Sequence, residues 1–415
     1  MTAQSTATVT TTSPEAFPGL GPWRRRISYA LIVLLGFSLG VSEFVVIGIE
    51  PELAENYQCS LAQIGDLISF FAISYAIVTP CLAIATARFR RSRLLAVYLA
   101  VFVAANFAAM VAPSLGVMLA SRVVMGAVAG PLLAVGTTYV SDLLGPWKSS
   151  MGISVVYAAF SIALVLATSA GRMVVALWSW HVALAAAFAF AVITAVLLVA
   201  VLPKERGRKR EAALASPRHQ VGLLKERAVV FGVLIFMFGV GGVYAFYGYV
   251  TPYLETDLGL SNAQSGAVLL VFGCLCFFSD LLSGWLDGKF GMKSLPPVFV
   301  VLTAALLGLW LSGTHVVPAL VAMSFIALLM YSFSIQAISM FMEIARRHHP
   351  GAVVLAASIE PTSFNIGIAF GTTMGGAAVT SLGLGSVGLV GGALSAVALV
   401  CAVLALRAWK QRQQS

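Results

Sequence analysis

Charge is scarce in this chain of 415 residues. Only 10% of the residues are charged, whereas 60% are hydrophobic, and the mean hydropathy is +0.95. A water-soluble protein of this length covers its surface with far more charge. The scarcity excludes an ordinary soluble protein and indicates that lipid surrounds most of the chain.

The motifs of several function classes are also missing. The sequence contains no Walker A motif and no His-Glu-x-x-His zinc motif, and it predicts no serine elbow at a strand-to-helix turn. Their absence argues against a self-contained ATP-driven pump and leaves a membrane-embedded enzyme as a distant alternative. The letters from Gly383 to Gly388 match a dinucleotide fingerprint, but they follow no predicted strand. We therefore expect no cofactor.

Cysteine is rare, and the few cysteines form no recognisable pattern. Most of the five lie inside apolar runs, and Cys274 and Cys276 have no second ligand pair. A disulfide framework and a metal site are therefore not expected.

Long apolar segments are the dominant feature of the sequence. A membrane-spanning helix needs about 20 apolar residues, because at about 1.5 Å per residue that length crosses the hydrocarbon core. The sequence predicts an all-α membrane protein with twelve such helices, at 28–49, 63–86, 94–112, 116–141, 150–172, 179–202, 228–250, 264–286, 296–313, 316–342, 351–380 and 384–406.

The basic residues follow alternate loops between these segments. With the N-terminus placed inside, 23 of the 25 Lys and Arg residues fall in inner regions, and only Arg122 and Arg172 lie within spans. The outer loops hold acids, including Glu50, Glu52 and Glu255, and no Lys or Arg. This asymmetry predicts that both termini are cytoplasmic. The basic charge therefore reflects membrane orientation and not nucleic-acid binding.

The chain also divides into two similar halves. We predict a disordered tail at 1–26, one six-helix bundle at 27–203, a charged linker at 204–227, a second six-helix bundle at 228–409 and a short tail at 410–415. An offset of 201 residues pairs the two halves over a span, a loop and the next span. The matched pairs are Gly40/Gly241, Pro51/Pro252, Leu53/Leu254, Ser60/Ser261, Ala62/Ala263, Gln63/Gln264 and Gly65/Gly266.

Two stretches carry a family resemblance. The first span contains Gly40-Val41-Ser42-Glu43-Phe44 followed by Gly48 and Pro51, and the fourth contains Arg122-Val123-Val124-Met125-Gly126. From Ile27 to Trp409 the chain resembles the major facilitator superfamily, and within it the twelve-span drug:proton antiporter branch, which includes arabinose and sugar efflux and chloramphenicol-resistance transporters. The resemblance implies two pseudo-symmetric bundles and a proton-coupling role for the intramembrane arginine.

A loop signature of that family adds a set of gating residues. It reads Gly-x-Leu-x-Asp-Arg-x-Gly-Arg between spans two and three. In the second half Gly284, Asp287 and Gly291 keep the glycines and place the acid one position early, and in the first half the basic cluster with Arg88 and Arg91 remains. The resemblance implies that these residues control conformational change.

Two ionisable residues inside the membrane are the candidate proton-coupling pair. Glu43 and Arg122 lie at a similar depth, each about 10 Å from the outer end of its span at about 1.5 Å per residue. A charge in hydrocarbon needs a partner or a function, so we expect the two to face a central cavity and to interact. The alternative is a static pair that orients the two helices. Arg172, near the outer surface, can snorkel outward.

Other polar and aromatic residues inside the spans are candidates for binding substrate. Glu360 precedes Pro361, where a helix kink is expected. The tyrosines offer an apolar face together with a hydroxyl group. The candidate substrate-binding residues are Glu360, Tyr244, Tyr247, Phe70, Tyr75, Tyr331, Gln336 and Asn365.

These observations predict a secondary transporter and not an enzyme. We expect a multi-pass inner-membrane protein, active as a monomer, that exports a small organic molecule such as a drug or a sugar in exchange for protons by alternating access. Export follows from the resemblance. A proton-linked importer or a facilitator of a sugar or another metabolite is the alternative.

Overall fold

The structure, a computed structural model, describes residues 20–86, 89–144, 146–203, 222–349 and 352–414. Most of the predicted N-terminal tail and of the 204–227 linker lies outside the described residues, as does Arg88. The first helix begins at Pro22, within the range expected for the tail, and the last helix continues to Gln414.

The first half of the chain folds into long helices that follow the predicted spans. Its main elements are α1 (Pro22–Phe44), η1 (Val45–Ile49), α2 (Glu50–Tyr57), α3 (Leu61–Ala85), α4 (Arg91–Met110), α5 (Leu115–Leu144), α6 (Pro146–Leu177) and α7 (Trp180–Val201). The first predicted span thus consists of an α-helix that continues as a short 3₁₀ segment.

The second half repeats this plan. Its elements are α9 (Arg227–Tyr247), α10 (Val250–Pro252), η2 (Tyr253–Asp257), α11 (Asn262–Phe290), η3 (Gly291–Ser294), α12 (Leu295–Ser312), α13 (Val316–Leu329), α14 (Ser334–His348), α15 (Val353–Leu382), η5 (Leu384–Ser386) and α16 (Val387–Gln414). The predicted span 316–342 is broken between α13 and α14.

Ten stretches of the described residues are long and apolar enough to cross a membrane. One of them, Asn262–Ser312, contains both α11 and α12, and α15 is not among the ten. All the regular structure in the described ranges is helical. The chain is therefore a multi-pass α-helical membrane protein.

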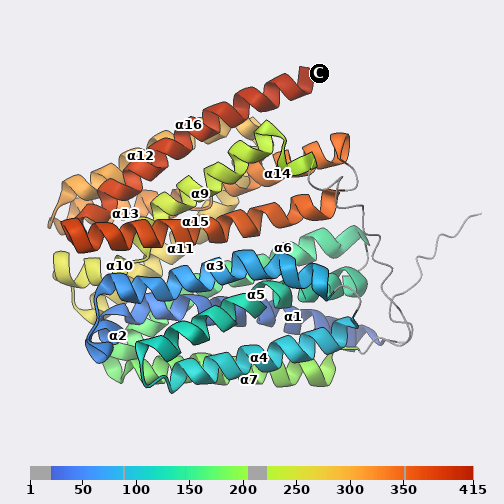
Figure 1. Ribbon diagram of the computed structural model, residues 1–415, viewed down its shortest axis with the longest axis horizontal. Helices are drawn as coiled ribbons and strands as arrows, with labels where there is room; N and C mark the ends of the chain where they lie inside the picture. Colours follow the sequence, from blue (N-terminus) through green and yellow to red (C-terminus); the bar gives the residue numbers. More distant parts are fainter. Residues whose placement is uncertain (1–19, 87–88, 145, 204–221, 350–351, 415) are drawn as a thin grey trace, which may run out of the picture.

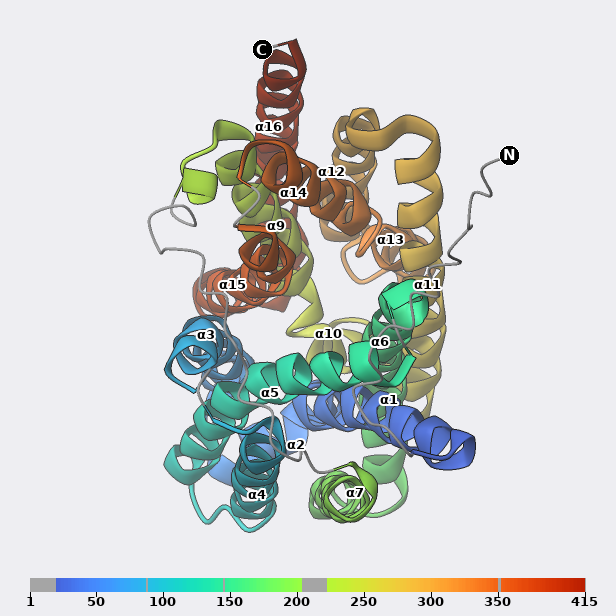
Figure 2. The same ribbon diagram turned by 90° about the vertical axis from the view of Figure 1, so that its right-hand side faces the viewer.

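The two halves form two bundles that lie against each other. Figure 2 shows α1 and α3–α7 in one bundle and α9 and α11–α16 in the other, with α4 and α7 at one outer edge and α12 and α16 at the opposite edge. In Figure 1 the helix ends at Pro22 and Gln414 lie on the same side of the molecule. We call this the tail side, and the opposite one the far side.

The matched residues of the two halves adopt the same local structure where α3 and α11 begin. Ser60 and Gln63 make reciprocal backbone bonds before α3, with Ser60 N donating to Gln63 Oε1 at 2.9 Å and Gln63 N donating to Ser60 Oγ at 3.3 Å. Ser261 and Gln264 make the same pair of bonds before α11, at 2.9 and 3.4 Å. This capping box satisfies helix N–H groups that would otherwise lack acceptors. The same local signal therefore starts the second helix of each half.

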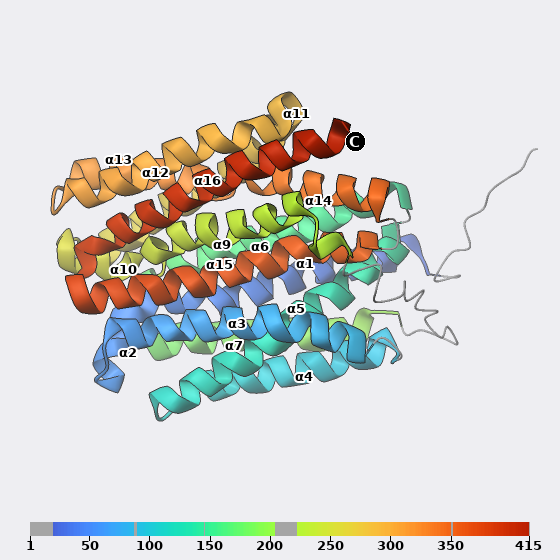
Figure 3. The same ribbon diagram turned by 45° about the horizontal axis from the view of Figure 1, so that its top comes forward.

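The bundles meet through two helix pairs. Helix α3 packs against α15, and α6 packs against α11; Figure 3 shows α15 lying along α3. Close approach is also needed within the second bundle, where a Cβ atom on Gly371 of α15 would collide with the backbone of Gly241 on α9. Small residues let membrane helices approach in this way.

Candidate functional site

Arg122, on α5, ties three helices of the first bundle together. Its side chain is 1% exposed. Nη1 donates to the carbonyl oxygen of Ser42 at 2.5 Å, Nη2 to that of Glu43 at 2.8 Å and Nε to that of Leu67 at 3.2 Å. The guanidinium carbon also lies 4.7 Å from the centre of the Phe71 ring. A planar guanidinium with several fixed N–H directions suits this set of acceptors.

The carbonyl groups that Arg122 binds are available because α1 changes its hydrogen-bonding pattern. At Val45 the α-helix gives way to the 3₁₀ segment η1. Such a change leaves carbonyl oxygens near the junction without the usual partner four residues later. Thr168 Oγ1 donates to the Phe44 oxygen at 3.4 Å, and Thr251 Oγ1 donates to the Ile47 oxygen at 2.6 Å. Side chains from both bundles thus satisfy an irregular segment at membrane depth.

Glu43 lies beside Arg122, as expected, but the two interact differently from a simple ion pair. Arg122 binds the backbone carbonyl of Glu43 and acts on its carboxylate through space. The Glu43 side chain is 3% exposed, and its Oε2 has no hydrogen-bond partner within the described residues. The arginine is therefore anchored, while the carboxylate keeps an oxygen available for a proton.

Aromatic residues of the second bundle gather next to Glu43. The Tyr244 ring lies 5.6 Å from the Tyr247 ring and 6.3 Å from the Phe364 ring. Tyr331, in the break after α13, stacks on Phe364 with the ring centres 5.6 Å apart. Tyr244 also lies within electrostatic range of Glu43. The structure therefore brings three predicted tyrosines together with Phe364, which was not among the predicted residues.

Tyr75 of α3 lies in the neighbourhood of both Glu43 and Glu360 of α15. It lies within electrostatic range of both carboxyl groups and of Tyr157 on α6. Tyr157 lies within electrostatic range of Glu360. Its side chain is 39% exposed, so it lies at the surface near these acids. Tyr157 was not among the residues predicted from the sequence, although it is the only tyrosine of α6. Asn365 donates to the Pro361 oxygen at 3.0 Å, and its Oδ1 is buried with no partner in the described chain.

Two other substrate candidates have different surroundings. The amide of Gln336 is fully occupied: Oε1 accepts from Ser283 Oγ at 3.1 Å, and Nε2 donates to Ser294 Oγ at 3.2 Å and to the Ser332 oxygen at 3.0 Å. These bonds join α14 to α11 and η3. Phe70 is exposed on α3, and no ring contact or hydrogen bond between described residues joins it to the tyrosines.

On the tail side, each bundle has a polar contact at a predicted gating position. In the first bundle Arg91 pairs with Asp142 at 2.5 Å, donates to the Thr138 oxygen at 3.2 Å and lies over the Tyr139 ring. The base thus comes from the start of α4 and the acid from the end of α5.

The second bundle makes the corresponding contact, but there the residue in the loop signature is an acid and not a base. Asp287, near the end of α11, accepts from Ser339 Oγ of α14 at 2.8 Å, and Ser339 is the partner of Thr138 at the offset of 201 residues. Gly291 ends the helix at a φ of +54°, and the space around Gly284 is open. Both contacts join the end of one span to another span of the same bundle.

On the far side, Arg172 bridges the two bundles. The prediction that Arg172 can snorkel outward is wrong, because its side chain is 1% exposed. Its Nη1 lies 2.6 and 2.7 Å from the two carboxylate oxygens of Glu52, in its own half. Its Nε lies 2.5 Å from Glu255 Oε1, in the other half. The two acids draw the guanidinium inward and connect the bundles.

Further hydrogen bonds between the bundles lie between the middle of the molecule and its far side. The hydroxyl groups of Thr168 and Tyr247 are 3.3 Å apart, and Thr373 Oγ1 donates to Ser69 Oγ at 3.2 Å. Together with the Thr251 contact to Ile47 and the Arg172 ion pairs, they hold the far side closed.

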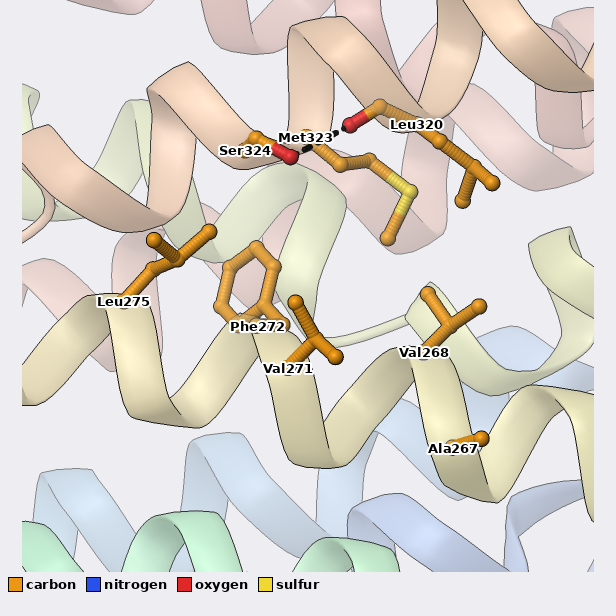
Figure 4. A pocket seen from close by; sticks show the side chains of 8 residues that line it. All are labelled: Ala267, Val268, Val271, Phe272, Leu275, Leu320, Met323 and Ser324. Atoms are coloured by element: carbon orange, nitrogen blue, oxygen red, sulfur yellow. Dashed lines mark hydrogen bonds between the residues drawn. The ribbon is translucent and has the colours of Figure 1, made fainter.

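An apolar groove of about 250 Å³ lies between α11 and α13. Figure 4 shows Val268, Phe272 and Leu275 on one wall and Met323 on the other. At the offset of 201 residues, Phe272 and Met323 correspond to Phe71 and Arg122. The place that holds a buried charge in the first bundle is therefore apolar in the second, so the repeat is not chemically symmetric.

In the described part of the chain, no three His, Cys, Asp or Glu residues form a group that could hold a metal ion.

Comparison with known proteins agrees with this architecture. The family model described as Major Facilitator Superfamily matches residues 32–359. The chain is 24% identical over 373 residues to an uncharacterized MFS-type transporter, YtbD, of Bacillus subtilis (strain 168), covering 89% of this chain and 92% of the relative.

Two solved structures share the fold at low sequence identity. The D-xylose-proton symporter superposes with a TM-score of 0.72 at 15% identity, covering 90% of this chain and 96% of the other. The nucleoside transporter NupG superposes with a TM-score of 0.72 at 15% identity, covering 93% of this chain and 99% of the other. The predicted fold is therefore confirmed, and the relatives are transporters and not enzymes.

Proposed function

The chain belongs to the major facilitator superfamily, and on that premise we propose that it is a proton-coupled exporter of a small organic molecule, a drug or a sugar. Transport proceeds by alternating access, in which the two bundles open the central site to one side of the membrane at a time. A proton entering from outside supplies the driving force.

The membrane topology belongs to this proposal. Helices α11 and α12 count as separate spans, α13 and α14 form one broken span, and α15 also crosses, which makes twelve. The tail side faces the cytoplasm of a bacterial-type cell, because the basic residues gather there. A single chain holds both bundles, so a monomer is sufficient.

The surroundings of Glu43 are the observation that supports proton coupling. Its carboxyl group is buried, has an oxygen with no partner among the described residues, and lies beside the fixed charge of Arg122. Burial favours the protonated acid, whereas a nearby cation favours the carboxylate. These opposed influences allow a small change in the surroundings, such as arrival of a substrate, to switch the proton occupancy.

The substrate site is the space between Glu43 and the aromatic residues of the second bundle. Tyr75, Tyr244, Tyr331 and Glu360 surround it, with Tyr157 at its edge. Aromatic faces next to hydroxyl and carboxyl groups suit a partly apolar molecule that carries hydrogen-bonding groups. Contacts of Ser69, Thr168 and Arg172 join the bundles on the far side, so in the proposed cycle this conformation precedes opening to the outside.

A gradient-driven transport assay tests the proposal. Inside-out membrane vesicles, whose lumen corresponds to the far side, are loaded to an acidic lumen and offered chloramphenicol, arabinose, D-xylose or a nucleoside. We expect at least one compound to accumulate when the lumen is acidic and not when the gradient is collapsed. Glu43→Gln, which cannot carry the proton, should remove the dependence on the gradient while Glu55→Gln, an exposed acid on α2, leaves it intact.

The same assay separates export from import. A proton-linked importer is favoured by the shared fold with a D-xylose-proton symporter, and it would release a preloaded compound from the acidic lumen. Gradient-driven accumulation that persists in Glu43→Gln would remove Glu43 from the proton path.

A further inference from the structure

Glu50, at the start of α2, is buried, although its sequence position places it in a solvated outer loop. The side chain is 1% exposed, and neither carboxylate oxygen has a hydrogen-bond partner in the part of the chain that the structure describes. A carboxylate removed from water without a donor or a cation is strongly disfavoured relative to the neutral acid. This conformation therefore favours a protonated Glu50.

The charges around Glu50 do not supply a cation for it. Glu52 and Glu255 lie at the same side of the molecule, and Arg172 makes ion pairs with both. The single guanidinium of Arg172 is thus already paired with two carboxylates. A third negative charge here would be repelled by the first two.

The remaining titratable groups near Glu50 are also not cations. The hydroxyl groups of Tyr247, the last residue of α9, and Tyr249, just before α10, lie within its electrostatic range. Asp66, on α3, acts on the same Tyr249 hydroxyl. These groups, from α9, from the residue before α10 and from α3, are neutral or acidic.

Glu50 is buried by the contact between the bundles. Helix α2 and the segment η1 both contact α10 of the other half, and Thr251 of α10 donates to the Ile47 oxygen at 2.6 Å. Opening the far side must move α10 away from these elements. Water then reaches the carboxyl group and stabilises its ionised form.

We propose that Glu50 is a second proton-binding site, separate from Glu43, that holds its proton while the far side is closed and loses it to external water when the far side opens. The O–H bond of the carboxyl group breaks, the proton passes to water, and the carboxylate remains solvated. This inference rests on the proposed alternating access. It makes external acid close the far side and external alkali open it.

Hydrogen-exchange mass spectrometry on the purified full-length protein in lipid nanodiscs tests this role without a substrate. The peptides to follow cover residues 45–57 and 247–258, with rates corrected for intrinsic exchange. If opening releases one proton, the open population rises about tenfold per pH unit over the range in which the open form is ionised and the closed form still holds its proton. Protection of both peptides should fall accordingly as pH rises through that range.

Two substitutions at Glu50 test whether the pH dependence of hydrogen exchange comes from this residue. Glu50→Gln should abolish the pH dependence and keep the peptides protected, whereas Glu50→Asp should retain it with a shifted midpoint. Glu55→Gln, an exposed acid on the same helix, should behave as wild type. A wild-type pH response in Glu50→Gln overturns the proposal, and so does a wild-type protein whose protection does not change. If Glu50→Gln does not fold, the midpoint shift in Glu50→Asp decides.

The two proposals fail in different ways. Glu43→Gln should lose gradient-driven transport and yet keep the far-side exchange response. A protein that carries no tested compound but shows the response in wild type and not in Glu50→Gln would contradict proton-driven export and support Glu50 as a proton site.

Discussion

At the residue scale, Arg122 depends on the shape of its side chain as well as on its charge. Arg122→Lys keeps the charge, but a single ammonium group cannot reach three carbonyl oxygens on two helices. We expect buried carbonyl groups to lose their donors, at about 1 to 3 kcal/mol each. The variant should therefore show a lower thermal midpoint in detergent and weaker transport.

A matched substitution separates this effect from a general response to lysine. Arg26→Lys changes an exposed arginine at the start of α1 and should leave the midpoint unchanged. If Arg122→Lys is as stable as Arg26→Lys, the three carbonyl bonds do not hold α1 and α3 to α5.

Glu226, just before α9, provides a pH-dependent contact on the tail side. It pairs with His349 Nε2 at 3.0 Å and accepts from Arg412 Nη2 at 2.7 Å. Burial raises the pKa of Glu226, but the hydrogen bonds and charges of these two partners outweigh burial and hold the pKa below its ordinary value. A carboxyl group whose folded pKa is lowered stabilises the folded state above its unfolded pKa, and this stabilisation is lost as pH falls through the folded value.

The expected result is a convergence of two stability curves. Wild type should unfold at a higher temperature than Glu226→Gln near pH 7, and the two midpoints should meet below about pH 4, since an unperturbed Glu titrates near about 4.3. Tryptophan fluorescence during heating measures both. Glu343→Gln, which removes an exposed pair with Arg347, should cost less than about 1 kcal/mol at any pH. A constant difference between wild type and Glu226→Gln down to acid pH would contradict the assignment.

At the element scale, the close contact between α9 and α15 determines how the second bundle packs. Gly371→Ala places a methyl group against the Gly241 backbone, and overpacking of this kind costs about 1 to 3 kcal/mol. Gly308→Ala, in α12, meets nothing within 4 Å and should be neutral or stabilise by up to about 1 kcal/mol through helix propensity. Thermal unfolding in detergent compares them, and equal midpoints would show that α9 and α15 can separate freely.

Hydropathy predicted the helices, because a span must be both long and apolar, and the residue pairs at an offset of 201 predicted the duplicated halves. They could not predict how α1 ends, since Val45–Ile49 is as apolar as the helix before it and the change to 3₁₀ leaves no mark in composition. The backbone partners of Arg122 follow from that change. The burial of Glu50 was missed because an acid next to Pro51 is typical of a loop, and Tyr157 was missed because an apolar helix gives little sign of which face turns inward.

At the scale of the whole molecule, a few polar contacts add to the helix packing that joins the two bundles on the far side. Within the described residues these include the Arg172 ion pair with Glu255 and the hydroxyl contacts of Ser69, Thr168, Thr251 and Thr373. Each must break when the far side opens, whereas the Arg172 pair with Glu52 stays within one bundle. Contacts that differ between two states determine the balance between them.

Removing the ion pair between the bundles should therefore shift the conformational equilibrium. Glu255→Gln keeps the Arg172 pair with Glu52 and weakens only the connection to the second bundle. We expect a shift toward the far-side-open form worth about 1 to 3 kcal/mol, or about 5- to 150-fold in population. Spin labels at Asn56 and Ser381, exposed at the far ends of α2 and α15, would report it as a larger share of long distances in pulsed electron resonance. Glu52→Gln is the matched control, because it leaves the cross-bundle pair in place and should shift the distances less. If both substitutions open the far side equally, Arg172 acts by orienting α6 and not by joining the bundles.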